Sequence, residues 1–244
     1  MKTNIRLGVN IDHVATVRNA RGENYPSPLR AALIAQKCKA NSVTIHLRED
    51  RRHIKDSDLK IIKKKLRIPL NLEIAATNEM LKIALKHKPN FICLAPEKRK
   101  EITTEGGLNL QFKTNYLKKF VSKIKKYSRV SLFIEPDLKS VTLAKMLQAD
   151  CVEFHTGVLC KLVNEKKLKS RSFKNEILKL QQAVQLANNL NLEVHAGHGL
   201  TFESAKILKK INGIEEYNIG HFLIGESIFE GLSKTIKKFK SILN

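Results

Sequence analysis

The chain has 244 residues, 42% of them hydrophobic, which is enough to bury one sizeable core, so we expect a single domain over residues 1–244. Its formal net charge of +22 comes from lysine pairs and triplets in many segments, which indicates solvated helix faces rather than one stripe that binds nucleic acid. The four cysteines are widely spaced without a C-x-x-C pair, which argues against a cysteine-rich zinc cluster and against a disulfide framework.

The segment before Asn10 carries no apolar signal core, and no stretch approaches the roughly 18 apolar residues that a spanning helix needs. We therefore expect a cytoplasmic protein that binds neither membrane nor nucleic acid. In that compartment, the cysteines are expected to be buried and reduced.

Short runs of Val, Ile, Leu and Phe alternate with longer stretches of 3.6-residue periodicity, which is typical of βα units and a parallel sheet. Eight such units predict an α/β fold, a (β/α)8 TIM barrel with extra helices. An open doubly wound sheet is the alternative, but its G-x-G-x-x-G fingerprint is missing after the first run. The expected strands lie at 5–11, 42–47, 69–75, 91–96, 129–135, 151–156, 192–196 and 216–220. The expected helices lie at 28–39, 57–66, 78–88, 116–127, 141–148, 175–190, 202–211 and 227–243.

Two segments are longer than plain connections. Residues 97–114 follow the fourth strand, and Gly106 and Gly107 suggest a mobile lid there. Residues 157–174 follow the sixth strand and are rich in Leu, Val and Lys, so we expect an extra helix.

Polar residues gather at the carboxyl ends of the expected strands, the face on which TIM barrels carry their active sites. Singly, each histidine also reads as an ordinary core or loop residue. Together with arginines and carboxylates, the imidazoles indicate proton transfer on an anionic substrate. The histidines in question are His13, His46, His53, His155, His195, His198 and His221, and the carboxylates are Asp12, Glu73, Glu135 and Glu153.

The first of three groups follows the first strand. Asn10, Asp12 and His13 come at its end, and we expect Arg18 and Arg21 in a loop that reaches back over the barrel mouth.

The second group lies in the stretch VTIHLREDRRH, residues 43–53. Strand alternation would point His46 and Arg48 to the same side. Glu49 and Asp50 are then placed to orient the arginines by ion pairing.

The third group pairs HAGHGLT with NIGHFLIG after the seventh and eighth strands. Barrels commonly hold a phosphate there on backbone N–H groups and a helix N-terminus. Glu73 is a separate case, because a carboxylate in an apolar strand is costly to bury. It is read either as a structural ion pair with an arginine or as a general base.

The segments GVNIDHVATVRNARG, HLREDRRHI, NLE, PEKRKEITTEGG, SLFI, HTG, AGHGLT and NIGH occur in this order between Leu7 and Gly231. In combination they resemble the pyridoxine 5'-phosphate synthase family of vitamin B6 biosynthesis. The resemblance implies condensation of 1-deoxy-D-xylulose 5-phosphate with 3-amino-2-oxopropyl phosphate to pyridoxine 5'-phosphate, phosphate and water. It also implies a TIM barrel with extra helices that assembles as a homo-octamer.

Carried over to this chain, the resemblance implies that His46 and Glu73 accept protons and that His198 donates one. Where the family form N-A-G-H-G is expected, the chain has His195 in place of Asn. The resemblance also implies that the deoxyxylulose phosphate is held by Asp12, His13, Arg48, His53 and Thr103. The amino-ketone phosphate is held by Asn10, Arg21, Gly199, Gly220 and His221.

No cofactor and no metal are expected for this reaction, because the amine of the substrate forms the imine that serves as electron sink. A Schiff-base aldolase would need a lysine inside the barrel, and the expected strands offer none. One alternative is a metal-dependent barrel hydrolase, but the first strand gives Asp-His rather than His-x-His. The other is a non-catalytic binder of phosphate ligands or nucleic acid, which only the bulk charge supports.

Overall fold

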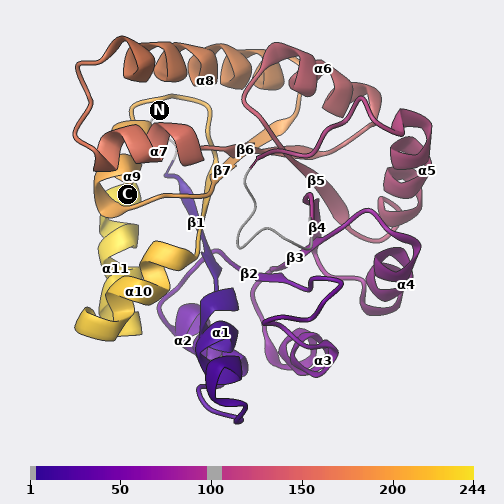
Figure 1. Cartoon of the computed structure of the whole chain (residues 1–244). Helices are drawn as coiled ribbons and strands as arrows, with labels where there is room; N and C mark the ends of the chain where they lie inside the picture. The colour runs from indigo at the N-terminus through magenta and orange to yellow at the C-terminus, as the bar shows by residue number, and fades with distance from the viewer. Residues whose placement is uncertain (1–3, 98–105) are drawn as a thin grey trace.

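The fold is a closed barrel of eight parallel strands. The computed structural model describes residues 4–97 and 106–244. Neighbouring strands pair in chain order, and β8 closes the barrel by pairing with β1 (Figure 1). This confirms the predicted (β/α)8 architecture. The strands are β1 (Arg6–Asn10), β2 (Ser42–His46), β3 (Leu70–Ile74), β4 (Phe91–Leu94), β5 (Arg129–Ile134), β6 (Cys151–His155), β7 (Glu193–Gly197) and β8 (Glu216–Ile219).

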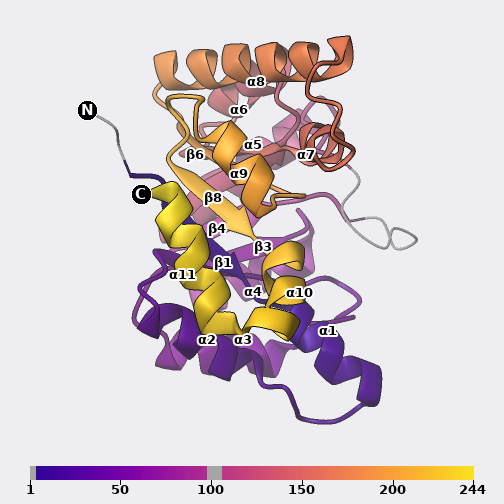
Figure 2. The same ribbon diagram turned by 90° about the vertical axis from the view of Figure 1, so that its left-hand side faces the viewer.

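Helices surround the barrel, and α7, α10 and α1 lie toward one of its ends (Figure 2). Several helices begin at a Ser, Thr or Asp whose side chain accepts a hydrogen bond from the third helical N–H, as Ser27 does before α2 and Thr77 before α4. The helices are α1 (Asp12–Arg21), α2 (Pro28–Lys37), α3 (Asp56–Lys65), α4 (Asn78–His87), α5 (Thr114–Ile124), α6 (Leu138–Met146), α7 (Gly157–Asn164), α8 (Arg171–Asn189), α9 (Phe202–Leu208), α10 (His221–Glu230) and α11 (Leu232–Leu243).

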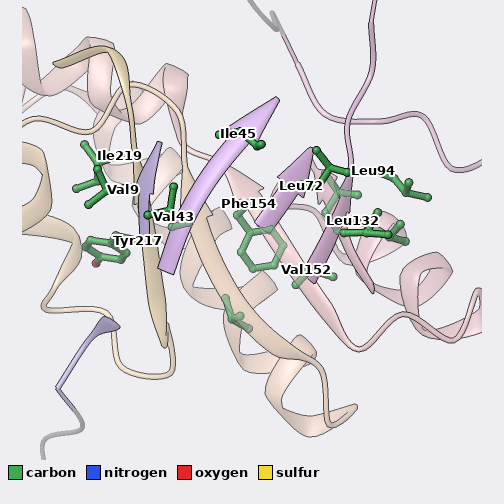
Figure 3. Close-up of a cluster of buried hydrophobic side chains, with 14 of the residues drawn as sticks. Val9, Val43, Ile45, Leu72, Leu94, Leu132, Val152, Phe154, Tyr217 and Ile219 are labelled. Atoms are coloured by element: carbon green, nitrogen blue, oxygen red, sulfur yellow. The ribbon is translucent and has the colours of Figure 1, made fainter. Parts of the chain in front are cut away.

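The apolar core lies between the outer surface of the barrel and the helices. Alternate residues of each strand point outward, and these are almost all apolar and fully buried. Figure 3 shows this for β6, where Val152 and Phe154 lie on the same side of the strand. The other outward residues labelled there are Val9, Val43, Ile45, Leu72, Leu94, Leu132, Tyr217 and Ile219.

The inside of the barrel is largely polar, unlike the bulky aliphatic filling that is common in this fold. Ser42 donates to Glu216 at 3.1 Å, Thr44 to Asn218 at 3.2 Å, and Asn218 to Glu153 at 2.8 Å. These bonds satisfy buried polar groups that would otherwise cost free energy. The interior is therefore fixed by a hydrogen-bond network that begins below the mouth.

Most expected elements are confirmed to within a few residues, and the extra helix after the sixth strand is α7. The prediction of a loop carrying Arg18 and Arg21 is wrong, because both residues belong to helix α1. The single expected helix at 227–243 is two helices, broken at Gly231, whose φ of +81° favours glycine.

Gly107 is packed closely against the end of β5. Its N–H donates to Glu135 at 2.8 Å, and a side chain at this position would clash with the backbone at the end of β5. The neighbouring Leu108 N–H bonds the carbonyl of Phe133 at 2.7 Å. This part of the segment is thus attached to the barrel, and lid motion stays a prediction.

The four cysteines are free thiols, and Cys93, Cys151 and Cys160 are buried as expected, whereas Cys38 at the end of α2 is partly exposed. Within residues 4–97 and 106–244, no helix combines the length and apolar character needed to cross a membrane.

Candidate active site

His46 occupies the centre of the candidate site, at the end of β2. Its Nε2 lies 2.8 Å from Oε1 of Glu97, and its Nδ1 lies 3.7 Å from Oε2 of Glu73. The other oxygen of Glu97 accepts a hydrogen bond from the Glu49 N–H at 3.0 Å, which fixes the carboxylate against the imidazole. Two carboxylates therefore face the two ring nitrogens of one histidine.

Glu73 neighbours His46 because the two residues are paired across β2 and β3. Its side chain is only 15% exposed. Burial raises the pKa of Glu73 well above its ordinary value, and the negative charges of Glu153 and Asp12 raise it further. An ion pair with an arginine, one of the two readings of this residue, is not among its contacts in the described residues. A carboxylate with a raised pKa is suited to exchange protons near neutral pH.

The end of β1 is joined to the end of β2 by Asp12. The Asp12 carboxylate accepts from the His46 N–H at 2.8 Å and from the Asn10 amide at 2.9 Å. On the other side, Asn10 lies against Gly220 at the end of β8, where an added Cβ would come within 3.1 Å of its side chain. Asn10 and Asp12 thus connect β8, β1 and β2 along the mouth.

Histidines line the same rim. The rings of His13 and His221 have centroids 4.9 Å apart, and those of His46 and His53 are 6.0 Å apart. Burial lowers the pKa of His13 and of His53. Both imidazoles are therefore mainly neutral near pH 7 and present one donor and one acceptor nitrogen.

The arginine-rich loop after β2 is organised by Asp50, one of the two carboxylates that were expected to orient the arginines; Glu49 takes part through its backbone carbonyl, which accepts from Arg51 at 2.9 Å. Asp50 contacts Arg48 at 3.5 Å and Arg52 at 2.6 Å. Burial raises the pKa of Asp50, but hydrogen bonds from Arg52 and the charge of Arg48 outweigh it and bring the pKa to about 2. Arg48 is 5% exposed, so its guanidinium is held in place beside the mouth.

A second group of ionisable residues lies across the mouth. His155, at the end of β6, binds Glu135 through Nδ1 at 3.0 Å, and its ring centroid is 4.8 Å from that of His198. Burial lowers the pKa of His198 to about 4, with further lowering by His155 and His221. His198 has a φ of +71°, a conformation that tertiary contacts must stabilise. Thr156 helps, since its hydroxyl donates to the His198 carbonyl at 2.8 Å.

Two glycines leave backbone exposed to a ligand at this end. Gly199 has a φ of +79°, and an added Cβ would come within 3.0 Å of Cys160. Gly220 precedes α10, whose first N–H groups have no side-chain cap. Free N–H groups at a helix N-terminus bind anions such as phosphate.

Two of the expected substrate-binding residues are not part of this cluster. Arg21 is the last residue of α1, its side chain is 80% exposed, and its contact is with Glu23 at 3.7 Å. The helix carries it roughly 12 Å from His13 along the helix axis. Thr103 lies outside the described residues. The other expected residues lie at the ends of β1, β2, β3, β7 and β8 or in the segments that follow them: Asn10, Asp12, His13, His46, Arg48, His53, Glu73, His198, Gly199, Gly220 and His221.

Sequence reasoning missed Glu97 and misplaced His195. Glu97 lies 51 positions after His46, and only its place just after an expected strand could have drawn attention to it. His195 was expected at the mouth, but it is the third residue of β7 and contacts Glu193 at the opposite end of the barrel. Glu153 lies below the mouth, where burial raises its pKa to about 7 and His195 opposes the rise.

Comparison with known proteins agrees with this arrangement. The model of the family "Pyridoxal phosphate biosynthesis protein PdxJ" matches residues 7–244. The chain is 57% identical to a pyridoxine 5'-phosphate synthase of Pelagibacter ubique, over 98% of this chain and 99% of that protein. It is 51% identical to a pyridoxine 5'-phosphate synthase of Zymomonas mobilis, over 100% of this chain and 93% of that protein.

Solved structures show the same fold at much lower identity. Phosphoribosyl anthranilate isomerase of Thermus thermophilus has a TM-score of 0.61 and 10% identity, over 98% of both chains. N-acetylmannosamine-6-phosphate 2-epimerase of Clostridium perfringens has a TM-score of 0.55 and 19% identity, over 88% of this chain and 86% of that one. This chain matches the family model over residues 7–244 and matches the named relatives over nearly their full length, and it therefore belongs to the PdxJ family of pyridoxal phosphate biosynthesis proteins.

Proposed function

We propose that this chain is a pyridoxine 5'-phosphate synthase. It condenses 1-deoxy-D-xylulose 5-phosphate with 3-amino-2-oxopropyl phosphate and releases pyridoxine 5'-phosphate, phosphate and water. The observation that carries the proposal is the contact between distant segments at one barrel mouth. His13 faces His221, and Asp12 binds the His46 N–H, in a family whose named relatives carry this activity.

His46 and Glu73 serve as the proton acceptors. The raised pKa of Glu73 supports this role, because a base is most effective when its pKa is close to the working pH. The contact between His46 and Glu97 supports the role of His46, since the carboxylate stabilises the imidazolium that forms on protonation. Imine formation, loss of water, loss of phosphate and ring closure all require such transfers.

His198 serves as the proton donor once substrate is bound. In the free protein its lowered pKa keeps the ring neutral. A phosphate dianion beside it favours the charged form and raises the pKa, so substrate binding loads the ring with the proton it donates. The proton source is thereby tied to the presence of substrate.

The two phosphoesters occupy different parts of the mouth. The amino-ketone phosphate binds at the N-terminus of α10, beside Gly199, Gly220, His221 and Asn10. The five-carbon phosphate binds at Arg48, His53, Asp12 and His13, together with Thr103, which lies outside the described residues. Arg48 supports this assignment because Asp50 orients its guanidinium, and a planar guanidinium fork suits phosphate. Arg21 lies at the exposed end of α1, so it contributes to the amino-ketone site only if its side chain moves from the position it has in this structure.

The residues favour this reaction over a Schiff-base aldolase, a metal-dependent hydrolase and a nucleic-acid-binding protein. None of the eight strands contains a lysine for a protein-bound imine. Within residues 4–97 and 106–244, the group of three closely spaced metal-type ligands is Cys151, Glu193 and His195, at the end of the barrel away from the mouth. The lysine pairs lie mostly exposed on several helices, which does not favour one nucleic-acid-binding face.

We also propose that the protein works in the cytoplasm as a homo-octamer. The buried free thiols suit a reducing compartment. Ile228 and Phe229 on α10 are 74% and 85% exposed, which suits an interface between subunits. Light scattering of the purified chain tests the assembly, and a monomer would rule it out.

The proposed reaction is tested by mixing the purified chain with both substrates. We expect the ultraviolet absorbance of a pyridine ring and release of inorganic phosphate in equal amounts, and neither product when one substrate is omitted. Phosphate release from one substrate alone would instead indicate a hydrolase. Binding of RNA with a steep dependence on salt, without turnover, would support the binding protein.

A further inference from the structure

Glu97 follows β4, outside the strands that carry His46 and Glu73, and it meets His46 at the barrel mouth. Its Oε1 lies 2.8 Å from Nε2 of His46, and its Oε2 accepts the Glu49 N–H at 3.0 Å. The side chains of His46 and Glu97 are 7% and 5% exposed, so water screens their contact only weakly. The carboxylate is thus fixed at both oxygens, by one imidazole and by one backbone N–H group.

The charge of Glu97 decides which atom donates in this contact. Burial raises the pKa of Glu97, but the hydrogen bond from His46 and its charge, together with the Glu49 N–H and the charge of Arg48, outweigh it and lower the pKa. The carboxylate is therefore ionised near neutral pH and has no proton to give. An ionised carboxylate only accepts hydrogen bonds, so the proton between the two groups belongs to Nε2 of His46.

We propose that Glu97 is a positioning residue that holds His46 in the Nε2–H tautomer and thereby makes Nδ1 the atom that accepts a proton from the substrate. A neutral imidazole carries its proton on one nitrogen and a lone pair on the other, and the hydrogen bond made by the first nitrogen fixes this choice. The role of Nδ1 rests on the proposed reaction, whereas the tautomer is a property of the free protein.

The lone pair of Nδ1 faces Glu73, whose Oε2 lies 3.7 Å away. That distance is too long for a hydrogen bond, so a substrate atom that enters between the two side chains can give its proton to Nδ1. An N–H bond then forms at Nδ1, and the electron pair of the broken bond stays on the substrate. Glu97 stabilises the imidazolium that results with its negative charge. The main chain of His46 is fixed as well, because its N–H donates to Asp12 at 2.8 Å.

Replacement of Glu97 by Gln should reverse the tautomer. The Glu49 N–H can only donate, so the amide oxygen of the new side chain stays with it and the amide NH2 group faces His46. Because an NH2 group donates, Nε2 must become an acceptor and the ring proton must move to Nδ1. The variant keeps the shape of the side chain and both of its contacts, but it leaves His46 without a lone pair at Nδ1.

Neutron diffraction from deuterium-exchanged crystals of the full chain locates the ring protons directly. At a mildly alkaline pD, we expect deuterium on Nε2 of His46 and none on Nδ1 in the unaltered protein, and the reverse in Glu97→Gln. Deuterium on Nδ1 of the unaltered protein, alone or together with Nε2, would overturn the proposal. If Glu97→Gln does not fold, the unaltered protein alone decides, and neither measurement needs turnover.

Steady-state kinetics test what the tautomer does in the reaction. Glu97→Gln should lower kcat by about 10²–10⁴-fold, the contribution of a general base, and should change KM for both substrates little. Glu203→Gln, at an exposed residue of α9, is the matched control and should keep the kcat of the unaltered chain. Unchanged kcat in Glu97→Gln, or a loss of affinity alone, would contradict the proposal. Absence of pyridine formation in the unaltered chain would instead refute the proposed function and leave the neutron result standing.

Discussion

The Glu73 carboxylate lies 3.7 Å from Nδ1 of His46, at the ends of two adjacent strands. The strand register creates this pair, and burial gives its carboxylate a raised pKa. Two proton-accepting groups thus lie side by side at the carboxyl ends of two parallel strands. The proposed chemistry depends on this pair.

Replacement of Glu73 by Gln should lower turnover by about 10²–10⁴-fold, the usual contribution of a general base. Gln keeps the size of the side chain, so substrate affinity should change little. Steady-state kinetics with both substrates measure the two effects, and Glu203→Gln, at an exposed residue of α9, is the control. Unchanged turnover would remove Glu73 from the mechanism.

Replacement of Glu153 by Gln should shift the pH profile of kcat/KM. The charge of Glu153 raises the pKa of Glu73, so its removal lowers that pKa. Because Glu73 acts in its deprotonated form, the acidic limb of the profile should move to lower pH. A limb that stays in place would show that Glu73 does not set it.

Replacement of Arg48 by Ala should weaken binding of 1-deoxy-D-xylulose 5-phosphate. Loss of charge-assisted hydrogen bonds costs about 1.5–3 kcal/mol, or roughly 10- to 150-fold in affinity. Calorimetry measures the dissociation constant, and Arg67→Ala, at an exposed position before β3, provides the comparison. Equal affinities for the two variants would contradict the role of Arg48.

His198 should make stability depend on pH. Its folded pKa of about 4 lies below the ordinary value of 6.5, so the unfolded chain takes up the proton first as pH falls. The contribution of the neutral ring to the free energy of unfolding is therefore complete above pH 6.5. It decreases as the pH falls toward 4, by about 3 kcal/mol in total. Urea unfolding should show a shallower acid loss for His198→Asn, because Asn tolerates the positive φ. Equal slopes would contradict the lowered pKa.

Two glycines offer a matched pair. Gly199→Ala introduces a side chain at a φ of +79° and within 3.0 Å of Cys160, so it should cost about 1–3 kcal/mol and weaken amino-ketone phosphate binding. Gly225→Ala lies inside α10 with nothing within 4 Å, and should stabilise the protein by about 0.5–1 kcal/mol. Chemical denaturation distinguishes them. A stabilising Gly199→Ala would show that the strain is absent.

The strands could be predicted because their outward residues are apolar and their runs are short, and the barrel follows from eight repeats of this pattern. Helix α1 could not be predicted, since it begins at Asp12 and the preceding residue, Ile11, offers no side-chain cap. Its Arg18 was expected to reach over the barrel mouth from a loop, but it is buried in an ion pair with Asp58 at 2.7 Å. That partner lies 40 residues away, and local patterns do not report such contacts.

The same limit explains the site. Residues at strand ends were found because a barrel brings those ends together. The position of His195 inside the barrel, below the mouth, could not be predicted, because it depends on the residue at which β7 starts. A shift of one or two residues moves a side chain from the mouth into the barrel. The contact of Glu97 with His46 depends on the course of a segment that has no periodic pattern.

The most direct test is a crystal structure of the Glu73→Gln protein with both substrates bound. We predict two phosphoesters at one barrel mouth, one at the N-terminus of α10 beside Gly199 and Gly220, the other beside Arg48 and His53. Their reacting carbons should lie between His46 and His198. A phosphoester bound at any other place, or only one substrate at the mouth, would contradict the account.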